Sequence, residues 1–145
     1  MHWKFIVVGR PALDYARRGV AEYLPRLQRH VRAEVEYLKD GPAEQVARRL
    51  ARAAEGCRRV VLDERGDLLT TEQFRSVVDK WELSGTKTVA LHIGGADGHS
   101  GGVRQSADLV LALGKFTLQH ELALVVALEQ VYRIYTLKKG EPYHR

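Results

Sequence analysis

The stretch from Ile93 to Gly98 is the part of this chain best suited to holding a small molecule. Its sequence, Ile-Gly-Gly-Ala-Asp-Gly, directly follows an apolar run. Because glycine lacks a Cβ atom, such a loop lets the backbone come close to a ligand. The spacing differs from the dinucleotide-binding pattern GxGxxG and from the phosphate-binding loop that ends in Gly-Lys-Ser/Thr. A backbone-lined ligand site and a plain tight turn are both consistent with this sequence.

Other residue types that carry chemistry do not form recognisable groups. The histidines lack the spacing of metal ligands, and the single cysteine, Cys57, has no partner for an intramolecular disulfide. The sequence contains no GxSxG motif, so a hydrolase triad has no support. We therefore expect no bound metal, and we expect Cys57 to be a structural residue at the end of a helix.

The composition is that of a globular protein with one domain. The chain has 145 residues, of which 45% are hydrophobic and 28% are charged, and this length suits one ordinary domain. The N-terminus lacks the apolar core of a signal peptide. The longest apolar run, Leu122 to Leu128, is far shorter than the roughly 20 residues that span a bilayer. We expect a single domain over residues 1–145, located in the cytoplasm and without a membrane partner.

The positive charge is concentrated in the first part of the chain. The net charge is +5 overall, with +6 in residues 1–60 and −1 in residues 61–145. A basic region of this kind favours a polyanionic partner such as nucleic acid, which binds through phosphate contacts. Arginine-rich helices with solvated faces would produce the same distribution, so the charge alone leaves both interpretations open.

Strands and helices alternate along the sequence. Most predicted strands are continuous apolar runs, which is typical of strands buried on both faces. The second predicted strand alternates polar and apolar residues, which indicates an edge position. The predicted strands are 3–8, 31–38, 59–63, 88–93 and 109–113. The predicted helices are 11–30, 43–55, 70–83, 103–106 and 120–137. Pro25 is expected to kink or break the first helix.

This alternation predicts an α/β fold with a mainly parallel sheet flanked by helices. Ligands of such sheets bind beyond the carboxyl ends of the strands. Three loops that contain glycine follow predicted strands, at residues 63–67, 94–98 and 114–119. We therefore expect these loops to lie together at one edge of the sheet. The last helix is apolar around its circumference over Leu122 to Leu128, which predicts burial against the core or against a second subunit.

Several segments together resemble the ribosomal RNA large subunit methyltransferase H family, a group of the SPOUT methyltransferases. The resemblance covers nearly all 145 residues. It is carried by the glycine loop at 93–98, by Leu128-Glu129-Gln130-Val131-Tyr132-Arg133, and by the ending Gly140-Glu141-Pro142-Tyr143-His144-Arg145. The combination of these segments at this spacing is specific, whereas each alone is weak.

The resemblance implies an α/β fold with a deep trefoil knot near the C-terminus, which is a rare exception to unknotted topology. It implies a homodimer that binds S-adenosylmethionine and methylates N3 of a pseudouridine in 23S rRNA on assembled ribosomes. The residues that would contact the cofactor by the family's pattern are Leu62, Gly94, Gly95, Leu113, Gly114, Lys115, Phe116, Thr117 and Leu118.

The same resemblance implies catalytic roles near the C-terminus for Arg133, Tyr143 and His144. An imidazole titrates near neutral pH, so His144 is the candidate for accepting the N3 proton of the base. The guanidinium groups of Arg133 and Arg145 suit contacts with phosphate or with the base. The resemblance leaves open which subunit supplies the tail to each site.

The chain departs from the family's pattern at three positions. Leu124 stands where the family usually has arginine, Gln119 where it has proline, and Gly114 where it has serine. Loss of an arginine that faces the substrate would favour an alternative function, a non-catalytic knotted dimer that binds ribosomal RNA. A further alternative, an unrelated nucleotide-binding α/β domain, rests on the glycine loops alone.

Overall fold

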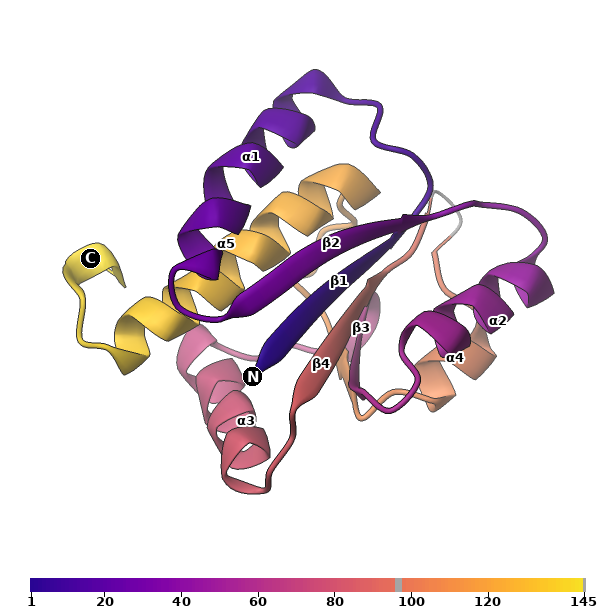
Figure 1. Cartoon of the computed structure of the whole chain (residues 1–145). Helices are drawn as coiled ribbons and strands as arrows, with labels where there is room; N and C mark the ends of the chain where they lie inside the picture. Colours follow the sequence, from indigo (N-terminus) through magenta and orange to yellow (C-terminus); the bar gives the residue numbers. More distant parts are fainter. Residues whose placement is uncertain (96–97, 145) are drawn as a thin grey trace.

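The computed structural model describes residues 1–95 and 98–144, apart from the side chain of His144. Within these residues, five parallel strands form one sheet in the order β2-β1-β4-β3-β5 (Figure 1). The strands are β1 (His2–Val8), β2 (Arg32–Leu38), β3 (Arg58–Asp67), β4 (Thr88–Ile93) and β5 (Leu109–Leu111). The helices are α1 (Asp14–Gln28), α2 (Ala43–Ala53), α3 (Thr71–Leu83), α4 (Gly101–Gln105) and α5 (His120–Lys138), followed by the 3-10 helix η1 (Pro142–His144). The predicted parallel α/β fold is confirmed.

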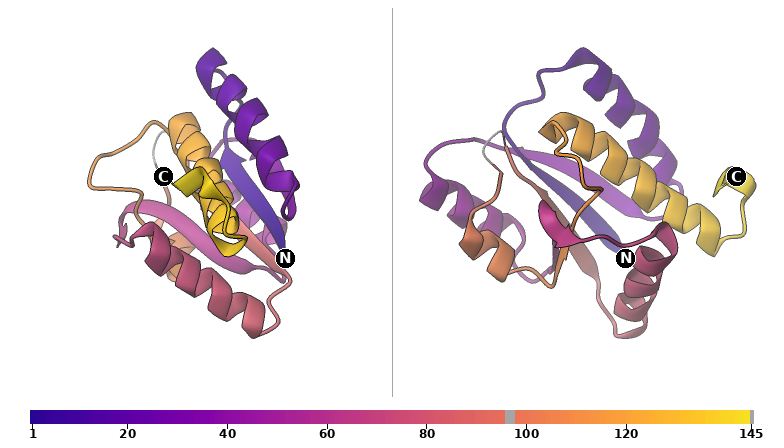
Figure 2. Two further views of the ribbon diagram at one scale, coloured as in Figure 1. Left: turned by 90° about the vertical axis from the view of Figure 1, so that its left-hand side faces the viewer. Right: turned by 180° about the vertical axis from the view of Figure 1, so that it is seen from behind.

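Helices cover both faces of the sheet (Figures 1 and 2). Helices α1, α3 and α5 pack on one face, and α2 and α4 pack on the other. Because successive side chains of a strand point to opposite faces, Trp3 and Phe5 of β1 enter the first core whereas Ile6 and Val8 enter the second. This two-sided burial explains why the strands are continuous apolar runs in the sequence.

The beginning and the middle of α1 differ from the prediction. The helix begins at Asp14 rather than at Pro11, and Pro25 lies inside it without ending it. Pro25 cannot donate a hydrogen bond to the carbonyl group of Ala21, one turn earlier. Both residues are exposed, so water can satisfy that carbonyl group and the helix continues.

Strand β3 extends through the predicted loop 63–67. After a shift of register between Leu62 and Asp67, Asp67 pairs with Leu111 of β5, and its carbonyl group accepts a hydrogen bond of 3.0 Å from the Ala112 N–H. Gly66 makes this pairing possible, because a Cβ atom there would lie 2.6 Å from the carbonyl carbon of Val110. The extension depends on a partner strand that is distant in sequence, so local pattern could not predict it.

Helix α5 lies in the middle of its face of the sheet, in contact with both α1 and α3. Gly19 of α1 allows the close approach, since a Cβ atom there would lie 2.8 Å from the Val125 side chain. Leu122 and Val126 of α5 stay half-buried.

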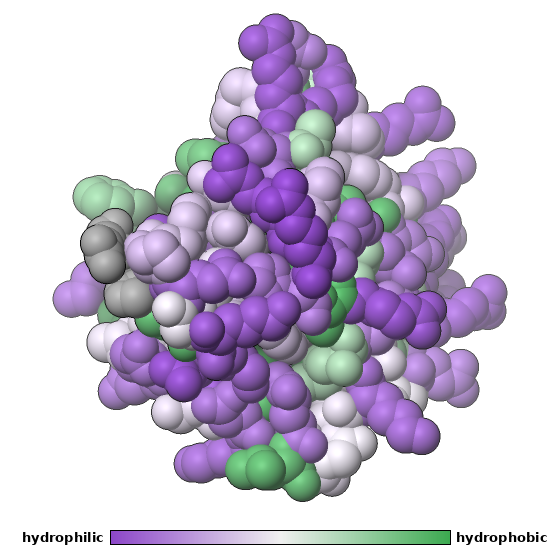
Figure 3. Space-filling model, turned by 60° about the vertical axis from the view of Figure 1, so that its left-hand side comes forward, coloured by the Kyte–Doolittle hydropathy of each residue, from purple (hydrophilic) through white to green (hydrophobic). Residues whose placement is uncertain are grey.

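Within the described part of the chain, no helix is long and apolar enough to cross a membrane. The face shown in Figure 3 is mainly hydrophilic, with small hydrophobic patches.

Candidate functional site

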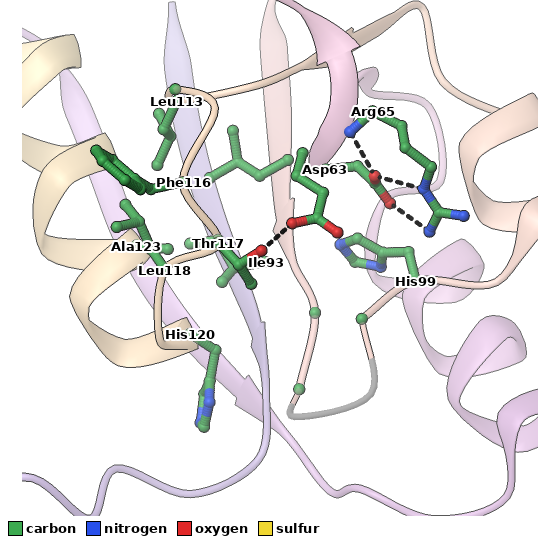
Figure 4. Close-up of a pocket in the computed structure, with 16 residues that line it drawn as sticks. Asp63, Arg65, Ile93, His99, Leu113, Phe116, Thr117, Leu118, His120 and Ala123 are labelled. Carbon is green, nitrogen blue, oxygen red and sulfur yellow. Dashed lines mark hydrogen bonds and ion pairs between the residues drawn. The ribbon is translucent and has the colours of Figure 1, made fainter.

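A cavity of about 250 Å³ opens at the carboxyl ends of β3, β4 and β5 (Figure 4). The three loops that the sequence analysis placed at this edge all line it, so that expectation is confirmed. The lining residues are Leu62–Arg65, Ile93–Gly95, Gly98, His99, Leu113, Gly114, Phe116–Leu118, His120 and Ala123. The cavity therefore combines the end of β3, the loop after β4, the loop after β5 and the first turn of α5.

Glycines set the shape of the loop after β4. The N–H of Gly98 donates a hydrogen bond of 3.0 Å to the carbonyl group of Gly95, and Gly98 has a φ of +73° that favours glycine. A Cβ atom on Gly94 would lie 2.9 Å from the carbonyl carbon of Gly98. By contrast, a Cβ atom on Gly114 would meet no atom within 4 Å. The backbone at Gly94 is thus tightly enclosed, whereas Gly114 lies at an open part of the rim.

One wall of the cavity carries the carboxylates of Asp63 and Glu64. The Asp63 carboxylate accepts a hydrogen bond of 3.0 Å from Nε of Arg65 and lies 3.5 Å from Nη1 of Arg104. Burial would raise the pKa of Asp63, but the hydrogen bonds and charge of Arg65, aided by Arg104, hold it below its ordinary value. Asp63 is therefore ionised and already neutralised.

The Glu64 carboxylate has a different environment. It accepts a hydrogen bond from the Thr117 hydroxyl group, which connects β3 to the loop 113–118 (Figure 4). Among the described residues, no cation forms an ion pair with Glu64. This carboxylate can therefore accept hydrogen bonds from a ligand. Within the same described residues, no group of three or more His, Cys, Asp or Glu side chains could hold a metal ion.

Two histidines lie behind the glycine loop. His99 borders the cavity, and its Nε2 lies 3.2 Å from the carbonyl oxygen of His92. The His92 side chain is 1% exposed, and neither of its ring nitrogens has a hydrogen-bond partner in the described structure. Burial, with smaller effects from His99 and Arg59, lowers the pKa of His92 to about 3. Burial also lowers the pKa of His99, so both rings are neutral at physiological pH.

All but one of the residues predicted to contact a cofactor line this cavity. The exception is Lys115, which is exposed and belongs to the same loop without being part of the lining. Residues 63–65 were expected at this edge as part of a loop but were not predicted as cofactor contacts, and neither His99 nor His120 was predicted at the site. The position of residues 63–65 directly after a buried strand was a usable signal. For His99 the sequence offered none.

Arg133 and Tyr143 lie together at the other end of α5. Nη2 of Arg133 lies 2.7 Å from Oε1 of Glu129, and the guanidinium carbon lies 4.8 Å from the centre of the Tyr143 ring. The Tyr143 hydroxyl group also donates a hydrogen bond of 3.4 Å to Glu129. The ring of Tyr132 packs against that of Tyr143 at a centroid distance of 4.7 Å. These contacts dock the tail on α5 instead of leaving it frayed.

This tail cluster is separated from the cavity of the same chain. The cavity borders α5 at His120 and Ala123, and Arg133 follows ten residues after Ala123. At 1.5 Å per residue, this places them about 15 Å apart along the helix. Figure 2 shows η1 beyond the far end of α5. The chain thus does not bring Arg133 and Tyr143 to its own cavity. The His144 side chain and Arg145 lie outside the described residues.

Two of the three departures from the family pattern have local structural roles. Leu124 is 1% exposed and lies in the core beneath α5, so a leucine fits this position. The side-chain oxygen of Gln119 accepts hydrogen bonds of 2.8 Å and 3.1 Å from the N–H groups of Glu121 and Leu122. It thereby caps the start of α5. Leu124 therefore packs in the core and provides no charge to a substrate, and the alternative of a non-catalytic dimer stays a prediction.

Fold and site together define a class of protein: a parallel α/β domain with a glycine-lined cavity at the carboxyl edge of its sheet. A family model described as "Predicted SPOUT methyltransferase" matches residues 1–144. Ribosomal RNA large subunit methyltransferase H of Thermus thermophilus is 48% identical over 145 residues, covering 100% of this chain and 99% of the relative. The protein of the same name from Deinococcus deserti is 39% identical and is covered completely. The chain therefore belongs to the ribosomal RNA large subunit methyltransferase H family of SPOUT methyltransferases.

Solved structures share the fold at low sequence identity. The tRNA (m1G37) methyltransferase of Aquifex aeolicus matches with a TM-score of 0.57 and 15% identity, over 92% of this chain and 70% of that one. A methyltransferase-like protein of Legionella pneumophila, in complex with the bound cofactor SAM, matches with a TM-score of 0.52 and 13% identity, over 92% and 66% of the two chains. Because the chain belongs to this family, the alternative of an unrelated nucleotide-binding domain is excluded.

Proposed function

We propose that this protein transfers a methyl group from S-adenosylmethionine to N3 of a pseudouridine in 23S rRNA of assembled ribosomes. One observation carries the proposal: three loops converge on one cavity in a chain that matches named rRNA methyltransferases over its whole length. The residues proposed to hold the cofactor are Leu62, Gly94, Gly95 and Leu113–Leu118. Lys115 is included as a member of that loop.

The chemistry of the cavity fits this cofactor. S-adenosylmethionine has a cationic sulfonium centre, an ammonium group and two ribose hydroxyl groups. The Glu64 carboxylate accepts a hydrogen bond from the Thr117 hydroxyl group. It can accept further hydrogen bonds from the donor groups of the cofactor. The enclosed backbone at Gly94 offers a surface that no side chain blocks. When bound, the cofactor supplies an electrophilic methyl group, and the chain's contribution is mainly to position the reactants.

The tail cluster is proposed to act on the target base. His144 is the candidate acceptor for the N3 proton, because an imidazole accepts protons near neutral pH. Arg133 would bind a phosphate or the developing anionic base through its planar guanidinium group. Glu129 holds that group in place at 2.7 Å. Burial raises the pKa of Tyr143, so its hydroxyl group stays protonated and keeps its hydrogen bond to Glu129.

A homodimer is part of the proposal, because the cavity and the tail cluster lie at opposite ends of α5. A second copy in antiparallel orientation would place its tail at the first copy's cavity. The half-buried Leu122 and Val126, beside the cavity, offer apolar contacts for such a partner.

The proposal also includes the C-terminal trefoil knot, formed by threading of the segment that leads into α5, and a cytoplasmic location, where ribosomes are found.

Transfer of a labelled methyl group tests the proposed function. Ribosomes that lack this modification are incubated with the purified protein and labelled S-adenosylmethionine, and the 23S rRNA is then digested and its nucleosides identified. We expect label on one pseudouridine. A relative that methylates the same ribosomes serves as the positive control. If the relative incorporates label and this protein does not, the proposal is overturned in favour of a non-catalytic RNA-binding dimer.

A further inference from the structure

The two basic helices of the N-terminal region differ in how their arginines are neutralised. On α1, Arg17 and Arg18 lie 2.9 Å and 3.1 Å from the two carboxylate oxygens of Asp14. Further along the same helix, Arg26 lies 3.2 Å from Glu22. Each of these cations lies beside a carboxylate one turn away, but Arg17 and Arg18 share that of Asp14. Helix α1 therefore keeps one net positive charge, against two on α2, which contains three arginines and one glutamate.

Helix α2 presents unbalanced positive charge. Arg48 and Arg52 are both exposed and lie one turn apart on the same side of the helix. In the described part of the chain, neither forms an ion pair, although Glu44 and Glu55 are nearby in sequence. Two like charges at this spacing slightly destabilise a helix. Phosphate groups would relieve this repulsion.

The start of α2 is connected to the cavity. Arg49 donates a hydrogen bond of 2.8 Å to the carbonyl group of Lys39, which orders the turn between β2 and α2. In this turn, the Asp40 carboxylate lies 3.4 Å from the point where a Cβ atom of Gly95 would be. A strand of RNA bound along α2 would therefore lead toward the glycine loop of the cavity.

The position of α2 also leaves it accessible in the proposed dimer. Helix α2 lies on the face of the sheet opposite to α1 and α5 (Figure 1). A partner that packs on α5 would approach the other face. The arginines of α2 would stay free in that assembly, whereas α1 lies beside the proposed dimer contact.

We propose that α2, through Arg48 and Arg52, is the surface that binds the RNA phosphate backbone, and that α1 is not. This inference rests on the proposed RNA substrate and specifies where that RNA lies. Guanidinium groups suit phosphate because their planar donors match its oxygens. Such contacts position the RNA without reading its sequence.

Two charge-matched double variants test this assignment. Arg48→Gln with Arg52→Gln removes two positive charges from α2, and Arg17→Gln with Arg18→Gln removes two from α1. Binding to 23S rRNA transcribed in vitro is measured by filter retention over a range of salt concentrations. We expect the α2 variant to bind about tenfold more weakly at low salt, with a salt slope smaller by about 1.5, since two phosphate contacts are lost. The α1 variant should stay within about twofold of the parent protein.

Equal weakening by the two variants, or greater weakening by the α1 variant, would overturn the inference. Calorimetric titration with S-adenosylmethionine and thermal melts should be the same for both variants, which excludes a folding defect. The methyl-transfer assay separates this inference from the proposed function. If the parent protein methylates ribosomes and the α2 variant binds RNA normally, the α2 assignment alone fails. If RNA binding depends on α2 and no methyl transfer occurs, the proposed function alone fails.

Discussion

The two ends of α5 are built on different principles. At its start, the cavity is lined by loop residues, with glycines in the loop after β4 and the Asp63 carboxylate already neutralised by Arg65. At its other end, Glu129, Arg133 and Tyr143 form a side-chain cluster of ionic and aromatic contacts. The first end suits the enclosure of a small molecule. The second suits contact with a charged, planar partner.

The two ends of α5 lie apart in one chain, so the proposed function needs a second copy to bring the cavity and the tail cluster together. About 15 Å of helix lies between Ala123 and Arg133, and the packing of α5 between α1 and α3 keeps that helix in place. Changes at the cavity should therefore affect cofactor binding, and changes at the tail cluster should affect transfer without affecting cofactor binding.

The largest expected effect comes from Gly94→Ala. The new Cβ atom would lie 2.9 Å from the Gly98 backbone, so the loop must shift. We expect affinity for S-adenosylmethionine to fall by at least about 100-fold, because a well-placed loop backbone is what holds the ligand. Gly102→Ala is the matched control, since its Cβ atom would lie 4.0 Å from Oγ of Ser100 and Gly102 does not line the cavity; it should change affinity less than about threefold. Calorimetric titration measures both. Similar losses in the two variants would contradict the assigned shape of the cavity.

Arg133→Gln should lower methyl transfer by about 100-fold while leaving cofactor affinity within about twofold, as expected for a group that acts on the substrate alone. Glutamine keeps hydrogen-bonding capacity but loses the charge that Glu129 holds at 2.7 Å. Single-turnover transfer to ribosomes and calorimetric titration provide the two readouts. A loss of cofactor affinity equal to the loss of transfer would place Arg133 at the cavity instead.

Mixing the two defective proteins tests whether a site combines residues of two subunits. If a site combines the cavity of one copy with the tail of the other, a mixed dimer of Gly94→Ala and Arg133→Gln contains one intact site. After exchange of subunits at equal amounts, transfer should recover to about a quarter of the parent activity, the share of intact sites expected from random pairing. No recovery, despite exchange shown by mass spectrometry, would mean that each site uses its own tail.

The buried histidines behind the cavity predict a loss of stability in acid. The pKa of His92 is about 3 in the folded protein, whereas an exposed histidine titrates near 6.5. As pH falls below about 6.5, the unfolded chain binds a proton that folded His92 does not, so stability decreases until the pH approaches 3. Between pH 7.5 and 5 we expect a loss of roughly 2 kcal/mol from this residue. Urea unfolding at several pH values should show a flatter dependence for His92→Leu. An unchanged dependence would contradict the burial of a neutral imidazole.

The smallest expected effect concerns the cap of α5. Gln119→Ala removes an oxygen that accepts hydrogen bonds from two N–H groups of the first turn. We expect a loss of about 1 kcal/mol in the free energy of unfolding, which is typical of lost helix caps. Gln105→Ala, at another exposed glutamine, should be close to neutral. If Gln119→Ala were equally neutral, the cap would have no role in fixing the start of α5 at the cavity.

Local sequence was sufficient to predict most elements. The apolar runs around Phe5, Val61 and Leu91 identified buried parallel strands, and the alternation after Val31 identified the edge strand β2. A helix was predicted to begin at about residue 70, and the structure shows the Thr70 side chain capping α3 by accepting a hydrogen bond from the Gln73 N–H. The loops that line the cavity were also predictable, because the carboxyl ends of parallel strands share one edge.

Elements that depend on distant partners were predicted poorly. The extension of β3 to Asp67 requires pairing with β5 and the absence of a side chain at Gly66. The tolerance of Pro25 inside α1 depends on which side of the helix faces solvent. No sequence pattern indicated that His99 lines the cavity, because its position beside His92 depends on how α4 follows the glycine loop.

The sequence by itself determined the parallel α/β fold, the family, and which loops gather at the carboxyl edge, because these follow from periodicity and from short segments of defined spacing. Tertiary structure alone decided that Leu124 faces the core, that the arginines of α1 are paired and those of α2 are not, and that the tail lies far from its own cavity. Local pattern reports which residues are apolar or charged. Distances between segments depend on how helices pack on the sheet, and this packing keeps the cavity and the tail cluster of one chain apart.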